Sequence, residues 1–237
     1  MKNIAIIPLR GGSIRVPRKN VRQFCGKPLM CWTIEAALES TLINEVYVTT
    51  DDDEIEEFAR LYPVKIIRRP DWPDADQAAA NRPLLHALEQ IHGEFRMVTL
   101  FATSPQRKPG DIDRAIAHHK NTGGQVAAMH RKRETFIYRD KGLGVAEAIL
   151  ADKYQQHFEL ASGLVSVQNS NWYRWFVPQL GTDLDADINR MIIDARDMPN
   201  NQLYYIEVEA WQVPETDSPE EFELCELIMQ RYILNGK

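Results

Sequence analysis

Short apolar runs alternate with longer amphipathic stretches along the first half of the chain. Residues 4–9 (IAIIPL) are continuously apolar, which is typical of a strand covered on both faces. Residues 27–40 (KPLMCWTIEAALES) repeat apolar side chains at the three- and four-residue spacing of a helix. Strands that alternate with helices of ~10–15 residues predict βαβ units on a parallel sheet. The pattern predicts further strands at 45–50, 64–70 and 96–101 and further helices at 51–62, 82–93 and 111–121.

Two of the expected helices begin with residues suited to capping. Asp53 and Glu56 have the spacing of a capping box. Near the C-terminus, Ser218 suits the N-cap position and Pro219 the first helical position. We therefore expect helices to start at both places, the second one after a strand within 203–213.

The middle of the chain has no clear periodicity. Residues 130–200 contain short β-like pieces and the aromatic cluster NWYRWFVP at 171–178. We interpret this part as an insertion or arm. Because the chain shows no internal repeat and no low-complexity linker, we expect residues 1–237 to form one domain.

Composition narrows the class of protein. Lys and Arg number 28 and Asp and Glu 34, a formal net charge of −6, which argues against nucleic-acid binding because phosphate backbones select basic faces. No run approaches the ~18 apolar residues of a membrane-spanning helix, and the apolar start is too short for a signal-peptide core. Cys25, Cys31 and Cys225 lack the spacing of a redox pair or a zinc site. These features predict a cytoplasmic protein with reduced thiols and no membrane partner.

A basic glycine turn, PLRGGSIRVPRKN at 8–20, follows the first apolar run. Parallel sheets bind ligands at the carboxyl ends of their strands, so the turn lies where a site is expected. Gly11 and Gly12 would let backbone amides approach a phosphate, and nearby arginines and lysines would supply charge. Neither GxGxxG nor the P-loop pattern is present, which disfavours a hydride-transferring Rossmann enzyme. From the residues alone, a triphosphate cradle and a solvated basic loop both stay open.

Five segments, in order, resemble the CTP-dependent cytidylyltransferases that activate acidic sugars. The resemblance is to the acylneuraminate group, which includes the pseudaminic and legionaminic acid enzymes, with the Kdo enzymes more distant. The segments are IAIIPLRGGSIRVPRKNVRQFCGKPLMCWTIEAALES at 4–40, VYVTTDDDEI at 46–55, RRPDWPDADQ at 68–77, LFATSPQR at 100–107 and ETDSPEEFELCE at 215–226.

The resemblance implies an α/β fold with a Rossmann-like, doubly wound, mainly parallel sheet of the nucleotide-diphospho-sugar transferase type. A small β-containing dimerisation arm would complete a homodimer. The implied reaction is attack of the sugar's anomeric hydroxyl on the α-phosphate of CTP, which releases pyrophosphate. Positioning and charge neutralisation dominate such chemistry, and Mg²⁺ is the implied cofactor.

The resemblance also assigns roles to individual residues. The implied nucleotide-binding residues are Arg10, Gly11, Gly12, Ser13, Lys19, Asn20, Arg69 and Ser104. The implied catalytic cations are Arg10, Arg15 and Lys19. The expected sugar-binding residues are Arg107, Arg131 and Arg133, and the expected metal ligands are Glu215 and Asp217.

Four positions depart from the family pattern. Ile14 stands where the family usually has lysine, Phe101 where it has glutamine, and Glu215 where it has the first aspartate of Asp-x-Asp. Glu159 stands near the place of an arginine that meets the sugar carboxylate in sialic-acid enzymes. The acid would then be held elsewhere, for instance by the basic run at 130–134, or the sugar differs.

Several of these assignments also have a purely structural interpretation. Asp217 could simply belong to a helix entrance beside Ser218, and the run at 130–134 could be a solvated turn. A nucleotide-binding relative that has lost turnover is the alternative to the enzyme. Retained CTP binding without pyrophosphate release would separate the two.

Overall fold

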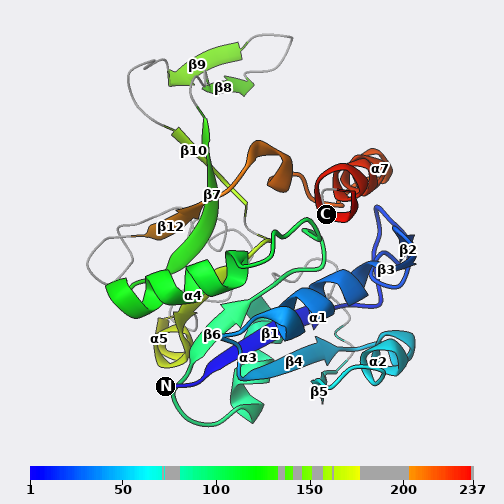
Figure 1. The fold of residues 1–237 in the computed structure, drawn as a ribbon, viewed down its shortest axis with the longest axis vertical. Helices are drawn as coiled ribbons and strands as arrows, with labels where there is room; N and C mark the ends of the chain where they lie inside the picture. Colours follow the sequence, from blue (N-terminus) through cyan, green and yellow to red (C-terminus); the bar gives the residue numbers. More distant parts are fainter. Residues whose placement is uncertain are drawn as a thin grey trace.

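A computed structural model shows a central eight-stranded sheet with helices on both faces (Figure 1). The structure describes residues 1–70, 72, 81–132, 137–140, 146–150, 157–161, 163–176 and 203–235. The strand order is β10-β7-β11-β6-β1-β4-β5, with β12 beside β7. These strands are β1 (Asn3–Leu9), β4 (Glu45–Thr50), β5 (Lys65–Arg68), β6 (Arg96–Thr99), β7 (Val126–Lys132), β10 (His157–Leu160), β11 (Ser166–Asn169) and β12 (Tyr204–Glu207).

Pairing within the sheet is mainly parallel, as the alternation of strands and helices predicts. β1 pairs in parallel with both β4 and β6, β4 with β5, and β12 with β7. β10 and β11 run antiparallel to their neighbours. The α/β, Rossmann-like fold class is therefore confirmed.

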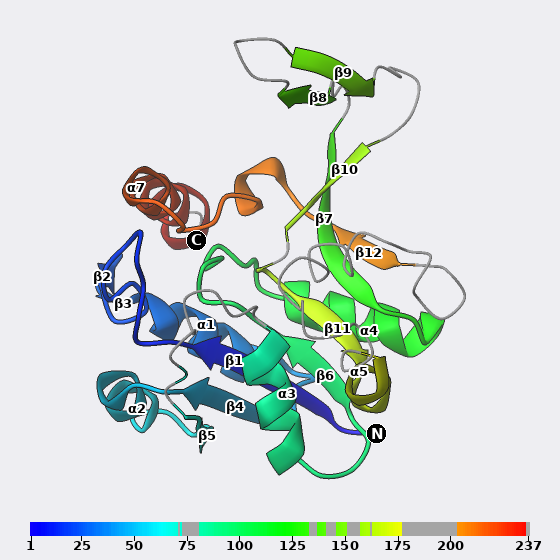
Figure 2. The same cartoon turned by 180° about the vertical axis from the view of Figure 1, so that it is seen from behind.

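Helices cover both faces of the sheet. The side chains of β1 point alternately to the two faces, so they show which helices lie on each. Ile7 packs with α1 (Leu29–Glu39) and α4 (Asp111–Thr122), whereas Ile6 packs with α3 (Asn81–Gln90). Figures 1 and 2 show α1 and α4 on one face and α3 with α5 on the other. The remaining helices are α2 (Asp53–Ala59), α5 (Ser170–Phe176), the 3₁₀ turn η4 (Ala210–Gln212), α7 (Pro219–Ile228) and the π-helical turn η5 (Met229–Leu234).

The segment expected to be an arm contributes to two different sheets. β10 and β11 belong to the main sheet, while β8 (Ile137–Asp140) and β9 (Ala146–Leu150) form a separate hairpin. The hairpin lies beyond the end of β7, away from the main sheet (Figures 1 and 2). Its role between two copies of the chain stays a prediction, as does the assignment of 1–237 to one domain.

Two local expectations need correction. The N-cap of α2 is Asp52 rather than Asp53, because the Asp52 backbone is extended and its carboxylate accepts the N–H of Ile55. The strand expected within 203–213 ends at Glu207, and the chain then turns through η4. The Ser218 cap with Pro219 at the start of α7 is confirmed.

None of the described helices is long and apolar enough to cross a membrane. Cys25, Cys31 and Cys225 are all free thiols, and the last two are buried.

Truncation of a buried β1 side chain tests the placement of the core. Ile7 is fully buried, so Ile7→Ala is expected to lower the free energy of unfolding by about 2–5 kcal/mol, through lost transfer energy and a new cavity. Leu61→Ala is the control, because Leu61 is 76% exposed and its loss should change stability by less than about 0.5 kcal/mol. Urea denaturation measures both, and equal losses would contradict this core.

Candidate functional site

The parallel register places several loops at one edge of the sheet. Leu9 of β1 lies opposite Thr50 of β4, so the glycine turn and the 51–52 segment start side by side. β6 ends at the same edge and continues into the 100–110 loop. β11 runs antiparallel to β6, so the described residues just before it, 161 and 163–165, also lie there. They are called the 161–165 segment below, and Ser162 lies outside the described residues. This edge brings together the segments that carry most of the expected site residues.

The glycine turn is held to the neighbouring strand by Asp51. The Gly11 N–H donates to Asp51 Oδ1 over 2.9 Å, and Arg69 Nη2 lies 3.1 Å from Asp51 Oδ2. Both side chains of this ion pair are buried. A Cβ on residue 11 would lie 2.3 Å from Asp52 Oδ2, so glycine is required here by a close approach within the protein. Arg69 thus contacts the turn through a carboxylate, and its expected role on the nucleotide side stays a prediction.

Arg18 ties the second half of the turn to the segment that follows β4. Its guanidinium donates to both oxygens of Asp52 and also contacts Glu54. Asp52 caps α2 at the same time, so the turn and the helix share one carboxylate. Arg18 has a φ of 54°, a left-handed conformation that this bidentate pair supports. Arg18, Asp51 and Asp52 were not among the expected site residues, although an acidic run directly after a parallel strand was the signal available.

Two cations of the turn converge on Asp217, from the other end of the chain. Lys19 Nζ lies 2.8 Å from Asp217 Oδ1, and Arg15 Nη2 lies 3.1 Å from Oδ2. The Lys19 side chain is 13% exposed, whereas that of Arg15 is 70% exposed. Burial raises the pKa of Asp217, but the Lys19 and Arg15 contacts outweigh it and leave the pKa below its ordinary value. The structure thus joins an expected metal ligand to two expected catalytic cations.

The remaining residues of the turn have different surroundings. Asn20 is buried, and its side-chain amide donates to the Arg10 carbonyl over 2.8 Å, so it shapes the turn. Gly12 is exposed, and Ser13 and Arg10 are half-buried. Ile14, where a lysine is usual in the resembling family, is 72% exposed.

Arg107 is buried and stabilises the 100–110 loop through hydrogen bonds. Its guanidinium donates to three backbone carbonyls and to the Thr33 hydroxyl, all at 2.6–2.8 Å. Desolvation lowers the pKa of Arg107, and the negative charges of Asp111 and Glu215 oppose that shift. Ser104 is 1% exposed beside it. The carbonyl acceptors belong to Phe101, Gly163 and Leu164.

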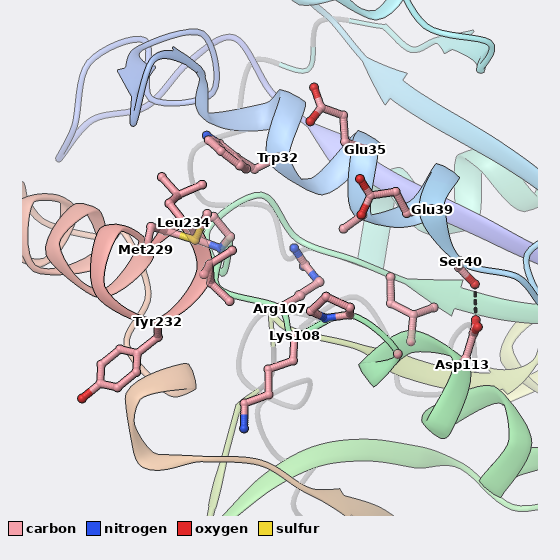
Figure 3. Close-up of a pocket in the computed structure, with 16 residues that line it drawn as sticks. Trp32, Glu35, Glu39, Ser40, Arg107, Lys108, Asp113, Met229, Tyr232 and Leu234 are labelled. Carbon is pink, nitrogen blue, oxygen red and sulfur yellow. Dashed lines mark hydrogen bonds between the residues drawn. The ribbon is translucent and has the colours of Figure 1, made fainter. Parts of the chain in front are cut away.

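Arg107 also lines a hollow of about 550 Å³ between α1, α4 and the C-terminal helix (Figure 3). None of the expected nucleotide-binding or metal-binding residues lines this hollow. It is therefore not the place where the sequence predicts the reaction.

The two expected metal ligands differ in their surroundings. Glu215 Oε1 accepts the Gly163 N–H and Oε2 accepts the Thr103 hydroxyl, both over 3.2 Å. Asp217 faces cations of the glycine turn and is 32% exposed. Among the residues that the structure describes, no three His, Cys, Asp or Glu side chains form a group that could hold a metal. Asp217 offers one carboxylate, which suits a magnesium ion that completes its shell with phosphates and water, whereas the Glu215 oxygens already accept the Gly163 N–H and the Thr103 hydroxyl. The assignment of both residues to a metal stays a prediction.

Of the other expected sugar-binding residues, Arg131 lies on β7. Arg131 pairs with Glu207 of β12 over 3.2 Å, and its guanidinium lies over the Phe158 ring. Glu159 of β10 lies opposite His130 of β7. Arg133 lies outside the described residues.

Removal of the Asp51 charge tests the buried pair. Asp51→Asn leaves the buried Arg69 guanidinium without this counter-charge and is expected to cost about 3–5 kcal/mol of unfolding free energy. Glu54→Gln is the matched control, because the Glu54 side chain is half exposed and its pair with Arg18 should contribute no more than about 1 kcal/mol. Chemical denaturation of both variants checks this, and similar losses would contradict the structural role of Asp51.

Acid sensitivity tests the pairing of Arg18 with Asp52. The Arg18 hydrogen bonds lower the pKa of Asp52, so the pair stabilises the protein above the unfolded pKa of aspartate, about 3.9. This stability is lost as the pH falls through the lower, folded value. Arg18→Gln is therefore expected to be destabilised at neutral pH, with a gap from wild type that shrinks toward pH 2. Unfolding free energies across pH measure the gap, and a constant gap would contradict the assignment.

The chain matches the family model described as cytidylyltransferase over residues 4–184. A CMP-N,N'-diacetyllegionaminic acid synthase of Legionella pneumophila is 35% identical over 137 residues, 54% of this chain and 58% of that protein. A pseudaminic acid cytidylyltransferase of Campylobacter jejuni is 40% identical over 111 residues, 44% of this chain and 47% of that protein. The matches thus span about half the length of these curated relatives.

The fold resembles that of a solved CMP:2-keto-3-deoxy-manno-octonic acid synthetase complexed with CTP. The TM-score is 0.74 at 18% identity, and the alignment covers 98% of this chain and 100% of the other. The assignment to a family rests on the family model, which matches most of the chain, and not on this distant structural likeness. The chain belongs to the cytidylyltransferase family.

Proposed function

We propose that the protein transfers CMP from CTP to the anomeric hydroxyl of an acidic sugar and releases pyrophosphate. The relatives named as legionaminic and pseudaminic acid enzymes support a nonulosonic acid as the sugar class. The single observation that carries the proposal is the meeting of Lys19 and Arg15 with Asp217 at the carboxyl ends of the strands. This arrangement offers two cations for phosphates and one carboxylate for a magnesium ion.

The reaction needs little covalent chemistry from the protein. A sugar hydroxyl attacks the α-phosphorus of CTP, the bond to the β-phosphate oxygen breaks, and pyrophosphate leaves. Negative charge spreads over the phosphate oxygens as the bond breaks, and fixed cations lower the barrier. Lys19 has the lower exposure of the two cations, so we assign it to the α-phosphate. The more exposed Arg15 is assigned to the outer phosphates.

The backbone of the glycine turn supplies the rest of the cradle. Asn20 and Asp51 fix its shape through the Arg10 carbonyl and the Gly11 N–H. Because these groups are already held before a nucleotide arrives, little ordering is needed on binding. Arg10, Gly12 and Ser13 remain assigned to the triphosphate, and Arg69 and Ser104 support the nucleotide side.

Magnesium would be held by Asp217 together with substrate phosphates and water, and its chemistry is charge neutralisation at the phosphates. Arg15 and Lys19 currently occupy the oxygens of this carboxylate. Nucleotide binding would draw the cations toward phosphate and leave Asp217 to the metal.

A nucleotide-binding protein without turnover is the second candidate function. The observation that favours it is the turn itself, where a side chain 72% exposed, Ile14, stands at a position usually occupied by lysine. Arg15 follows directly and already contacts Asp217, so it compensates part of the missing charge.

We also propose a cytoplasmic homodimer in which residues 130–200 form the contact, with Arg131 and Arg133 near the sugar.

Pyrophosphate release tests the proposal directly. Wild type is assayed with CTP, Mg²⁺ and a panel of nonulosonic and related sugar acids. Lys19→Ala removes a charge-assisted bond of ~1.5–3 kcal/mol and is expected to lower kcat/KM about 10- to 150-fold. Lys65→Ala is the control, because Lys65 is 60% exposed at the start of β5, away from the carboxyl ends. It should retain wild-type activity.

The outcomes separate the two candidates. Release with one sugar, reduced in Lys19→Ala alone, establishes the enzyme and its substrate. CTP binding by calorimetry without release across the panel favours the protein without turnover. Failure to bind CTP would overturn the triphosphate cradle itself.

A further inference from the structure

One segment at the site edge, residues 161–165, is tied down by two long side chains from other parts of the chain. It connects β10 to β11 and lies at the carboxyl end of β6. Its central residue, Gly163, has both backbone polar groups bonded to Glu215, Phe101 or Arg107. Backbone bonds to β7 anchor the two ends of the segment, because the Ala161 N–H donates to the Ala128 carbonyl and the Val165 carbonyl accepts the Ala128 N–H. Gly163, at its centre, is held instead by residues distant in the sequence.

The first tie is Glu215. Its two carboxylate oxygens divide between the Gly163 N–H and the Thr103 hydroxyl. A second link binds the same loops, because the Thr216 N–H donates to the Thr103 carbonyl over 2.9 Å. Glu215 thus joins the 161–165 segment to the loop after β6, and its length spans the gap between them.

The second tie is Arg107. Its Nη2 donates to the carbonyls of both Phe101 and Gly163 over 2.7 Å, and its Nε donates to the Leu164 carbonyl over 2.6 Å. The Phe101 N–H also donates to the Gly163 carbonyl over 3.0 Å. Because Arg107 is 5% exposed, these bonds form away from water and fix the segment strongly.

The ties place Gly163 directly against Ser104. A Cβ on residue 163 would lie 2.0 Å from Ser104 Oγ, so no larger residue fits without displacing that side chain. Ser104 is assigned to the nucleotide side of the site. The position of the 161–165 segment therefore sets the wall against which substrate would bind.

We propose that Glu215 is a positioning residue that, with Arg107, holds the 161–165 segment against Ser104 on the substrate side of the site, and that it is not a metal ligand. The inference rests on the proposed function for its consequence in catalysis, but its structural part stands on the contacts alone. A metal ion at Glu215 would have to share its oxygens with the Gly163 N–H and the Thr103 hydroxyl, which already fix the direction of the carboxylate. Asp217, two residues on, accepts no backbone N–H among the described residues and faces the cations.

A shortened carboxylate separates the two roles. Glu215→Asp keeps a hard oxygen ligand for magnesium but removes one methylene, so it would no longer reach the Gly163 N–H. Positioning predicts at least a tenfold faster hydrogen exchange of that amide in the ligand-free protein, followed by NMR or mass spectrometry of the 161–165 segment. It also predicts a raised KM for CTP with kcat less changed, because the loosened segment no longer packs against Ser104 on the nucleotide side. Manganese affinity at saturating CTP, measured by electron paramagnetic resonance, should stay within twofold.

Asp217→Asn is the matched control, expected to weaken manganese binding and leave the Gly163 amide unchanged. Thr103→Val removes the other partner of Glu215 while keeping the side-chain shape, and should also speed exchange in the segment. It guards against a Glu215→Asp variant that fails to fold. Unchanged exchange in both variants, or a loss of manganese affinity in Glu215→Asp equal to that in Asp217→Asn, would overturn the inference.

Failure of the proposed function has a different signature. It would leave wild type without pyrophosphate release, whereas the exchange experiment requires no substrate and no turnover. The two conclusions can therefore fail independently.

Discussion

The register between β1 and its two parallel neighbours is the constraint on which the site depends. Because Leu9 lies opposite Thr50 and Ile6 lies opposite Thr99, three strands end at one edge and release their loops there. β1 is nearly fully buried, so its apolar run has no freedom to slide without exposing one face to water. Burial of β1 therefore fixes where the loops at this edge begin, and with them the side chains of the candidate site.

Two kinds of ion pair occupy this edge, and their burial separates their roles. The pair of Asp51 with Arg69 is nearly inaccessible to water, so breaking it leaves a stranded charge and the pair acts as permanent structure. The contacts of Asp217 are more open, most of all that with Arg15, which is 70% exposed and can be replaced by solvent at low cost. Only the second kind can change partners when an anionic ligand arrives. The protein thus builds a rigid frame and an exchangeable charge cluster from the same residue types.

The fold was largely predictable from the sequence, and the site only partly. The period of the apolar positions identified the strands and helices, because burial on a sheet or helix face leaves a direct mark on the chain. Lys19 and Arg15 could be proposed as site residues from the sequence, since their glycine turn is local. Their contact with Asp217 was not predictable, because it joins residues about 200 positions apart. The cap of α2 is Asp52 rather than Asp53, and the bond of the same carboxylate to a distant arginine, Arg18, was likewise not predictable.

Arg107 and Glu215 show which contacts residue type alone does not reveal. An arginine beside a nucleotide loop suggests an anion site, and an acidic pair before a helix suggests a metal site. In the folded chain, the donors of Arg107 and the oxygens of Glu215 meet backbone groups that have few other partners. Buried N–H and C=O groups must be paired somewhere, so a loop that cannot pair within itself recruits charged side chains to do it. The 161–165 segment shows this at one position: the Leu164 N–H pairs within the segment, with the Ala161 carbonyl, whereas the Gly163 N–H pairs with Glu215, a side chain long enough to reach it.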